Sequence, residues 1–320
     1  MEALYIILGS LAAVVILVLL IAFICFYLAF YVPKKNKTPK TEYDLPQDKI
    51  YVPYHDKMIE WIKEVRTFKY EEVSITSFDG LTLRGKYYEY KKGAPIELMF
   101  HGYRGTAERD LCGGVKRCFT LGRNVLLVDQ RGASKSDGNV ITFGINESKD
   151  CLRWIDFIIE KFGDDVKIIL CGISMGASTV LTVADKDLPK NVVGILADCG
   201  YNNAKEIIKK VVKELKLPPN LIYPFIKLGA RLYGGFNLEE SSPEKALKNC
   251  KVPVIFFHGD DDAFVPYYMS EKNYNACASP KKLVKVEGAG HGMAFLIDPD
   301  NYLKEVAQFF TENGVETVVQ

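Results

Sequence analysis

The sequence predicts an α/β protein in which a doubly wound, mostly parallel sheet follows a membrane-spanning helix. Two observations support this prediction. From Ile96 onward, short β-branched apolar segments alternate with longer segments of helical spacing, the pattern of parallel strands joined by helical crossovers. Before them, Ala3 to Val32 is one apolar run without a charged residue. At about 1.5 Å per residue, a helix of this length exceeds a hydrocarbon core of about 30 Å.

The apolar run has two alternatives, a secretory signal peptide and a buried core helix. A signal peptide has a cationic start and a shorter apolar stretch, whereas this chain begins with Met1 and Glu2. We therefore expect residues 1–33 to form a retained transmembrane anchor. The basic residues that follow it directly are Lys34, Lys35, Lys37 and Lys40. The positive-inside rule then predicts a single-pass protein of the cell membrane with its C-terminal body in the cytoplasm.

Length and composition limit the other classes of function. The chain has 320 residues, enough for one large α/β domain with a full core. Its formal net charge of +1 gives no reason to expect nucleic acid as a partner. The eight cysteines lack a zinc-ligand spacing, and several lie in apolar segments typical of buried free thiols. We expect no metal site and no organic cofactor, and the sequence indicates no oligomeric state.

After the anchor, residues 34–70 are expected to form a linker that ends in a short docking helix. The first part is polar and poorly periodic, whereas residues 57–65 have helical apolar spacing. Residues 71–320 then form the sheet domain. It opens with a predicted β-hairpin, residues 72–78 and 81–90, because Asp79-Gly80 between them is a strong hairpin signal.

The remaining elements follow from apolar runs and their spacing. Further strands are expected at residues 96–100, 124–129, 168–171, 192–197, 252–257 and 282–286. Helices are expected at residues 111–121, 149–162, 177–184 and 300–310, with a helical insertion at about 202–238. A continuous apolar run such as 124–129 is typical of a parallel strand that is covered on both faces.

The segment from Gly172 to Gly176 places Ser174 between two glycines where a strand becomes a helix. This is the nucleophile-elbow pattern, in which a tight turn pushes the serine out of the backbone and leaves room only for glycine two positions away. By itself the pattern is also compatible with an ordinary strand–helix turn and a surface serine. A base, an acid and an oxyanion site at fitting places would favour a nucleophile.

His291 is the best candidate for the base. A serine hydroxyl needs a base to remove its proton, and an acid must hold that base in one tautomer. Of the four histidines, only His291 lies between glycines in the loop after the last strand, from which a side chain can reach across the sheet edge. For the acid, Asp260, Asp261 and Asp262 compete, with Asp198 as an outsider, and the surplus carboxylates are expected to accept hydrogen bonds from turn amides.

Backbone amides are the best donors for an oxyanion because the fold fixes them beforehand. One is expected from Met175, directly after the serine, and the other from the loop that follows residues 96–100, for which we choose Tyr103. His101 stands in the same loop. We expect its ring to tie the loop down rather than to transfer protons.

Five ordered motifs give a specific resemblance. They are His-Gly-Tyr-Arg-Gly (101–105), Asp-Gln-Arg-Gly-Ala-Ser-Lys-Ser (129–136), Gly-Ile-Ser-Met-Gly (172–176), His-Gly-Asp-Asp-Asp-Ala-Phe-Val-Pro (258–266) and Gly-His-Gly (290–292). From about residue 72 to 310 the chain resembles the alpha/beta-hydrolase superfamily, most closely its single-domain bacterial serine hydrolases of the serine-aminopeptidase-like (Hydrolase_4) branch. The chain departs from many relatives at Ala133, where they carry histidine at a position that is not catalytic.

The resemblance implies an alpha/beta-hydrolase fold with nucleophile, acid and base in the order Ser174, Asp262 and His291. In that family the acid stands four residues before the proline of the Val-Pro pair, which selects Asp262. The resemblance also implies that the insertion at about 202–238 is a small helical lid. Its first helix has an apolar face and a lysine-rich face. The lid could lie on an anionic membrane surface and admit lipidic substrates, or it could be a plain cap with its lysines in water.

These observations predict a membrane-anchored serine hydrolase that cleaves a carboxylic ester or a related acyl bond, with a small-molecule or lipid-like substrate. A carboxylesterase or lipase is favoured over a peptidase. A serine peptidase of aminopeptidase type on the same fold stays an alternative, as does a non-catalytic binding scaffold. Intact Ser174, Asp262 and His291 argue against the scaffold, because binding alone does not require all three.

Overall fold

The computed structural model describes residues 1–33 and 41–315 of the chain, and within them one twisted sheet has eight strands. The strands are β1 (Glu71–Thr76), β2 (Thr82–Tyr88), β3 (Ile96–Phe100), β4 (Asn124–Asp129), β5 (Ile168–Ile173), β6 (Val192–Asp198), β7 (Val254–Gly259) and β8 (Lys281–Val286). Their order across the sheet is β1-β2-β4-β3-β5-β6-β7-β8. The predicted doubly wound α/β fold is confirmed.

The sheet is antiparallel at one end and parallel in the rest. β1 and β2 form the predicted hairpin, with Glu71 opposite Tyr87, and β2 pairs antiparallel with β4. From β3 to β8 every pairing is parallel. Because the carboxyl ends of parallel strands share one edge, the loops after β3, β5, β7 and β8 gather there.

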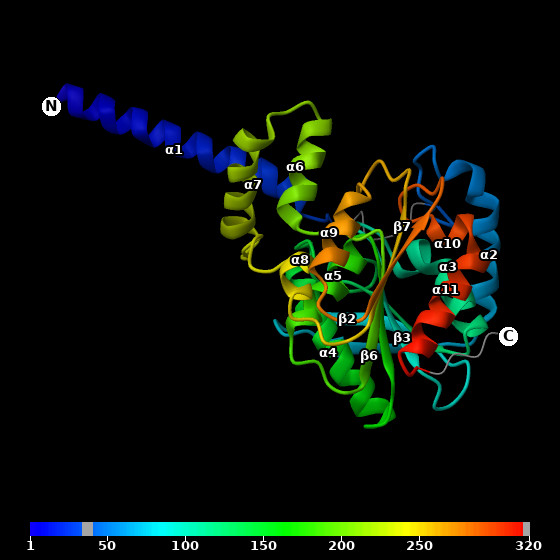
Figure 1. The fold of residues 1–320 in the computed structure, drawn as a ribbon. Helices are drawn as coiled ribbons and strands as arrows, with labels where there is room; N and C mark the ends of the chain where they lie inside the picture. Colours follow the sequence, from blue (N-terminus) through cyan, green and yellow to red (C-terminus); the bar gives the residue numbers. More distant parts are fainter. Residues whose placement is uncertain (34–40, 316–320) are drawn as a thin grey trace.

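Helices cover both faces of the sheet (Figure 1). One face carries α2 (His55–Thr67), α3 (Ala107–Thr120), α10 (Ala294–Ile297) and α11 (Pro299–Glu312). The other carries α4 (Ile145–Phe162), α5 (Met175–Thr182), α8 (Pro243–Leu247) and α9 (Tyr268–Ala276). The central strands are apolar along their whole length because both of their faces are buried.

The long helix α1 (Glu2–Ala29) projects from this body (Figure 1). It is long and apolar enough to cross a membrane and could serve as an anchor. Its C-terminal part packs against α7 (Pro219–Tyr233), which forms a helical hairpin with α6 (Ala204–Glu214). The lysines at 34, 35, 37 and 40, on which the predicted orientation depends, lie outside the described residues.

Residues 41–70, the described part of the predicted linker and docking helix, pack on the body. Helix α2 buries Trp61, Ile62 and Val65 in the core on its side of the sheet. A short 3-10 turn, Val52–Tyr54, precedes it. Just before that turn, the Tyr51 hydroxyl donates a hydrogen bond to the carbonyl oxygen of His291 at 2.6 Å. This segment therefore touches the loop that carries the predicted base.

Candidate active site

Ser174 occupies a strained turn between β5 and α5. Its backbone has φ 55° and ψ −118°, a combination that residues other than glycine rarely adopt. The flanking glycines are needed for space. A Cβ added to Gly172 would lie 2.2 Å from the carbonyl carbon of Gly176, and a Cβ added to Gly176 would lie 2.0 Å from the carbonyl oxygen of Phe100. The turn thus has the crowding that the spacing predicts.

His291 connects Ser174 with Asp262. It lies in the loop between β8 and α10, at the carboxyl edge of the sheet. Its Nε2 is 2.8 Å from Ser174 Oγ, and its Nδ1 is 2.7 Å from Asp262 Oδ2. A carboxylate only accepts hydrogen bonds, so Nδ1 carries the proton in the neutral ring and Nε2 is left to accept the serine proton.

The loop after β7 fixes the Asp262 carboxylate. Its Oδ1 accepts hydrogen bonds from the backbone amides of Phe264 and Val265, at 2.9 and 2.8 Å, which turns Oδ2 toward His291. His258 Nε2 lies 3.2 Å from the same Oδ2. Burial disfavours the charged carboxylate, but hydrogen bonds from His258 and His291 outweigh burial and hold the pKa of Asp262 well below its usual range.

The competing carboxylates have other contacts. Asp260 Oδ1 accepts a hydrogen bond from the amide of Gly288 at 2.8 Å, and Asp261 is exposed. Asp198, at the end of β6, accepts a hydrogen bond from the Tyr302 hydroxyl at 3.2 Å. Of these four aspartates, the structure brings Asp262 alone into hydrogen-bond contact with His291.

The loop after β3 lies against Ser174. A Cβ added to Gly102 would be 3.5 Å from the Ser174 Cβ. The Gly102 amide donates to Asp110 Oδ2 at 2.9 Å. The amides of Tyr103 and Met175, by contrast, donate to no other group within residues 1–33 and 41–315. An oxyanion hole requires uncommitted amides, so both residues keep the property that the predicted role needs.

His101 fixes this loop. Its Nε2 accepts a hydrogen bond from the amide of Gln130 at 3.0 Å, so Nδ1 carries the proton and donates to the carbonyl oxygen of Gly102 at 2.8 Å. The Gln130 side chain in turn donates to the carbonyl oxygen of His101 at 2.6 Å. Both ring nitrogens are thus hydrogen-bonded, one to Gly102 in the loop and one to Gln130 after β4. His101 therefore holds the loop in place, as we expected.

Apolar side chains from the segment after α1, the body and the helical hairpin form a cover over Met175, next to Ser174. The cluster around Met175 comprises Val32, Tyr103, Ile141, Phe143, Tyr201, Ile207, Val265 and Met269. Under this cover the Ser174 residue is only 7% exposed. Met175, directly after Ser174, therefore faces an apolar environment that suits the hydrocarbon part of a ligand.

The end of the anchor is bonded to the candidate oxyanion loop. The Tyr103 hydroxyl donates to the carbonyl oxygen of Ala29 at 2.7 Å. The Arg104 guanidinium donates to the carbonyl oxygens of Leu28 and Tyr31, at 2.8 and 3.1 Å. Sequence reasoning missed these contacts, the Tyr51 bond to His291 and the place of His258 beside Asp262. Of these contacts, only the one between His258 and Asp262 could have been suspected from the sequence, because the two residues are four positions apart.

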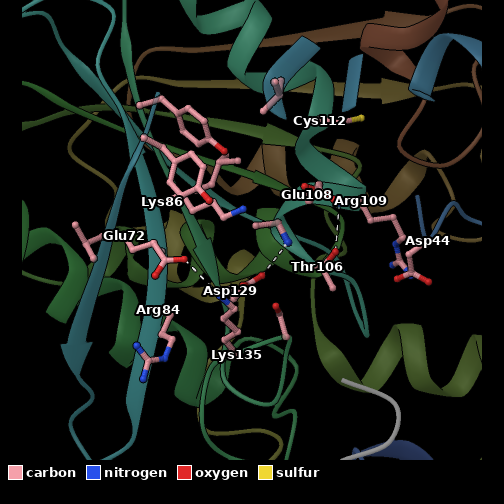
Figure 2. Close-up of a pocket in the computed structure, with 18 of the residues that line it drawn as sticks. Asp44, Glu72, Arg84, Lys86, Thr106, Glu108, Arg109, Cys112, Asp129 and Lys135 are labelled. Atoms are coloured by element: carbon pink, nitrogen blue, oxygen red, sulfur yellow. Dashed lines mark hydrogen bonds and ion pairs between the residues drawn. The ribbon is translucent and has the colours of Figure 1, made fainter. Parts of the chain in front are cut away.

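A separate pocket of about 190 Å³ lies over the β1–β2 side of the sheet and the start of α3 (Figure 2). Charged side chains of both signs line it, and Lys135 there contacts Glu72 at 3.4 Å. Neither Ser174 nor His291 lines this pocket. It also lacks a hydrogen-bonded base and nucleophile, so it does not compete with the Ser174 site as a place for acyl transfer.

One group of potential metal ligands coincides with the site. Cys199 Sγ, an oxygen of Asp262 and a nitrogen of His291 lie within 4.8 Å of one another. The His291 nitrogens are already engaged by Asp262 and Ser174. Burial also raises the pKa of Cys199 well above its usual value, which disfavours the thiolate that binds metals. The donor set therefore fits acyl-transfer chemistry better than a metal centre.

Comparison with known proteins links this geometry to hydrolases. A family model described as the alpha/beta hydrolase fold matches residues 98–232. The chain is 29% identical to the uncharacterized protein YqkD of Bacillus subtilis, over 59% of this chain and 62% of that protein. It is 25% identical to the lysophosphatidylserine lipase ABHD12 of Rattus norvegicus, over 58% of this chain and 46% of the lipase.

A solved structure agrees with these matches. The Pyrococcus furiosus esterase Pf2001 superposes with a TM-score of 0.63 at 22% sequence identity, covering 78% of this chain and 93% of the esterase. The chain spans less than two thirds of the length of the two curated relatives named above. The proteins that it resembles include esterases and a lipase.

Proposed function

We propose that this chain, which has the alpha/beta-hydrolase fold, is a serine hydrolase that cleaves a carboxylic ester or a related acyl bond through an acyl-enzyme intermediate. One observation carries the proposal. Ser174, His291 and Asp262 form an unbroken hydrogen-bonded chain, with contacts of 2.8 and 2.7 Å. Each member has the donor or acceptor role that activation of a serine requires.

Acylation follows from this arrangement. Ser174 Oγ attacks the ester carbonyl carbon while its proton passes to His291 Nε2, and the charged Asp262 stabilises the imidazolium that forms. The negative charge on the carbonyl oxygen is met by the amides of Met175 and Tyr103. His291 then returns its proton to the alcohol oxygen as the carbon–oxygen bond breaks. The alcohol leaves, and the acyl group remains on Ser174.

Deacylation uses the same groups in reverse. A water molecule attacks the acyl carbon while His291 accepts one of its protons, and the same two amides hold the oxyanion. The Ser174–acyl bond breaks, Oγ recovers the proton from His291, and a carboxylic acid is released. Both half-reactions balance with water as the only co-reactant.

The surroundings of Ser174 support an ester with a hydrocarbon acyl chain. The cover over Met175 is built mainly from apolar side chains such as Val32, Ile141 and Ile207. The names of similar proteins, an esterase and a lysophosphatidylserine lipase, point in the same direction. A series of p-nitrophenyl esters assayed beside aminoacyl anilides would separate esterase from aminopeptidase activity. We expect turnover of the esters, and exclusive turnover of the anilides would contradict the substrate class.

The proposal includes the location. Helix α1 would cross the cell membrane once and hold the body on the cytoplasmic side, next to membrane lipids. A green fluorescent protein fused to the C-terminus should fluoresce in this orientation, and an alkaline phosphatase fused at the same point should be inactive. The opposite pair of results would reverse the orientation.

Replacement of Ser174 by alanine tests the nucleophile. Fluorophosphonate probes form a covalent bond with an activated serine, so Ser174→Ala should abolish labelling of the full chain. Ser178→Ala is the matched control, because Ser178 is a buried serine one turn further along α5 that hydrogen-bonds the carbonyl oxygen of Tyr201. The control should keep its labelling. Full-strength labelling of the Ser174→Ala protein would refute the assignment.

A further inference from the structure

Helix α7 has an apolar face that no described part of the body covers. Leu221, Phe225, Leu228 and Leu232 recur at intervals of four, three and four residues and share one side of the helix. Leu221 is 62% exposed and Leu232 is 52% exposed, and the two between them are partly exposed. At the turn into α7, Leu215 and Leu217 are exposed as well. A soluble body rarely leaves so many adjacent large apolar side chains in water.

The neighbouring side of α7 packs directly on α1. The Tyr233 hydroxyl donates to the carbonyl oxygen of Leu19 at 3.1 Å, and the Tyr233 ring packs edge-on against Phe23. A Cβ added to Gly229 would lie 2.3 Å from the carbonyl oxygen of Ala22, so the two backbones approach closely there. The exposed stripe of α7 therefore continues the apolar surface of α1.

The length of α1 fixes where this contact lies relative to a bilayer. A straight helix needs about 20 residues to cross a hydrocarbon core of about 30 Å. Every residue of α1 before Val18 is exposed, so the free part alone is too short. Counted from Ala3, the required length ends at about Ala22. Leu19 and Ala22, which α7 contacts, then lie at the boundary between the core and the headgroups.

The fold turns α7 toward that boundary. Figure 1 shows α7 on the side of the molecule from which α1 projects, with α6 between α7 and the sheet. Basic residues border the apolar stripe: Lys213, Lys216 and Arg231 are exposed, and among the described residues none of the three forms an ion pair. An apolar helical face with a basic border is the composition of helices that lie in the interface of an anionic membrane.

We propose that the α6–α7 hairpin is a second membrane-contact surface, with the outer face of α7 seated among the headgroups and upper acyl chains of the bilayer that α1 spans. This inference rests on the proposed span of α1 and not on the acyl-transfer chemistry. Seated in this way, the hairpin places the cover of Ser174 against the lipid surface. An ester with a long acyl chain then reaches the site without crossing water.

Depth-dependent quenching of tryptophan tests the surface. The full chain is reconstituted in vesicles that contain anionic phospholipid and dibrominated phosphatidylcholine, whose bromines quench tryptophan only from within the bilayer. Leu221→Trp and Leu232→Trp place reporters at two independent exposed points of the stripe. Lys304→Trp is the control, on an exposed position of α11 at the opposite side of the molecule (Figure 1). The native Trp61 and Trp154 are buried in the body and contribute the same background to every variant.

We expect the reporters at 221 and 232 to be quenched several-fold more than the reporter at 304. Equal quenching at all three positions would overturn the proposal and leave the face to another occupant, such as a second protein. The measurement needs no turnover, so it is independent of the Ser174 assignment. A chain without fluorophosphonate labelling that still shows the quenching pattern would refute the proposed function and retain the membrane surface.

Discussion

The surroundings of two buried aspartates near Ser174 shift their pKa values in opposite directions. Asp262 accepts hydrogen bonds from two backbone amides and from His291, which keep it ionised. The Asp198 carboxyl group accepts one hydrogen bond, from the Tyr302 hydroxyl to Oδ2, and its Oδ1 has no partner among the described residues. Burial raises the pKa of Asp198 to about 6, and the charge of His258 only partly opposes this. Asp262, next to His291, therefore stays ionised to a lower pH than Asp198 does.

Replacement of each aspartate by asparagine should separate their roles. Asp262→Asn removes the acceptor that holds His291 in its tautomer, so kcat for a short-chain ester should fall by about a thousandfold to ten-thousandfold. Asp198→Asn keeps the size of the side chain and leaves the hydrogen bonds of Ser174 and His291 intact, so kcat should stay near that of the unmodified chain. Steady-state assays of both variants make the comparison. A larger loss of kcat in Asp198→Asn than in Asp262→Asn would assign the role of the acid to Asp198.

Asp198 also predicts a pH dependence of stability. Its pKa rises from 3.8 to about 6 on folding, so the native state binds a proton that the unfolded state has released. This contribution is complete below pH 3.8 and is lost as the pH rises through 6, at a cost on the order of 3 kcal/mol. Asp198→Asn removes the titration. Its gain in the free energy of unfolding should therefore be larger at about pH 8 than at about pH 4.5, as measured by urea unfolding in detergent. An equal gain in the free energy of unfolding at the two pH values would contradict the assignment of this pH dependence to Asp198.

At the scale of elements, a buried ion cluster joins β3 to the start of β4 and to α3. Glu97 on β3 lies between Arg117 on α3 and Arg123 just before β4, and all three side chains are buried. Burial disfavours the carboxylate, but the two guanidinium charges outweigh burial and lower the pKa of Glu97. The cluster fixes α3, whose Asp110 accepts the hydrogen bond from Gly102 beside Ser174.

Glu97→Gln should destabilise the fold strongly. The substitution keeps the volume but removes the carboxylate charge that both buried guanidinium groups contact, which costs about 3–5 kcal/mol of unfolding free energy. Glu72→Gln is the matched control, because the Glu72–Lys135 pair on the surface is 63% and 72% exposed, and such pairs contribute about 0–1 kcal/mol. Chemical denaturation of both variants gives the two values. Similar small losses would mean that the buried cluster contributes little.

At the scale of the whole molecule, the end of the proposed anchor is packed into the body. Phe26, Phe30 and Val32 are buried, and Phe30 packs edge-on against Phe143 and Phe236 from the body. Two residues after Phe30, the backbone amide of Val32 donates a hydrogen bond to the carbonyl oxygen of Asn139 at 2.8 Å. The proposed membrane helix and the cover over Met175 therefore share one segment of chain.

Phe30→Ala tests this integration. Removing a fully buried phenylalanine leaves a cavity and should lower the free energy of unfolding by about 3–5 kcal/mol. Leu17→Ala is the control within α1, because Leu17 is 56% exposed. Thermal unfolding of the two variants in the same detergent should show a lower Tm for Phe30→Ala alone. Unchanged melting of that variant would mean that the anchor is only a tether.

Features of the fold that depend on local spacing could be predicted from the sequence. Apolar periodicity predicted the strands, five of the flanking helices and the long apolar helix, because each of these signals is confined to a few neighbouring residues. The short helices α8, α9 and α10 were not predicted. The glycines around Ser174 likewise indicated a crowded turn. The three adjacent aspartates could not be separated by spacing, and the choice of Asp262 came from a family resemblance.

The tertiary structure alone decided what covers each apolar face. Hydrophobic burial has no direction, so a sequence indicates that a helix face is apolar but not which distant segment packs on it. The bond from Tyr51 to His291 spans 240 residues, and the bond from Tyr103 to Ala29 spans 74. These contacts, together with the packing of α7 on α1, follow from the arrangement of the whole sheet and its helices, which no local pattern contains.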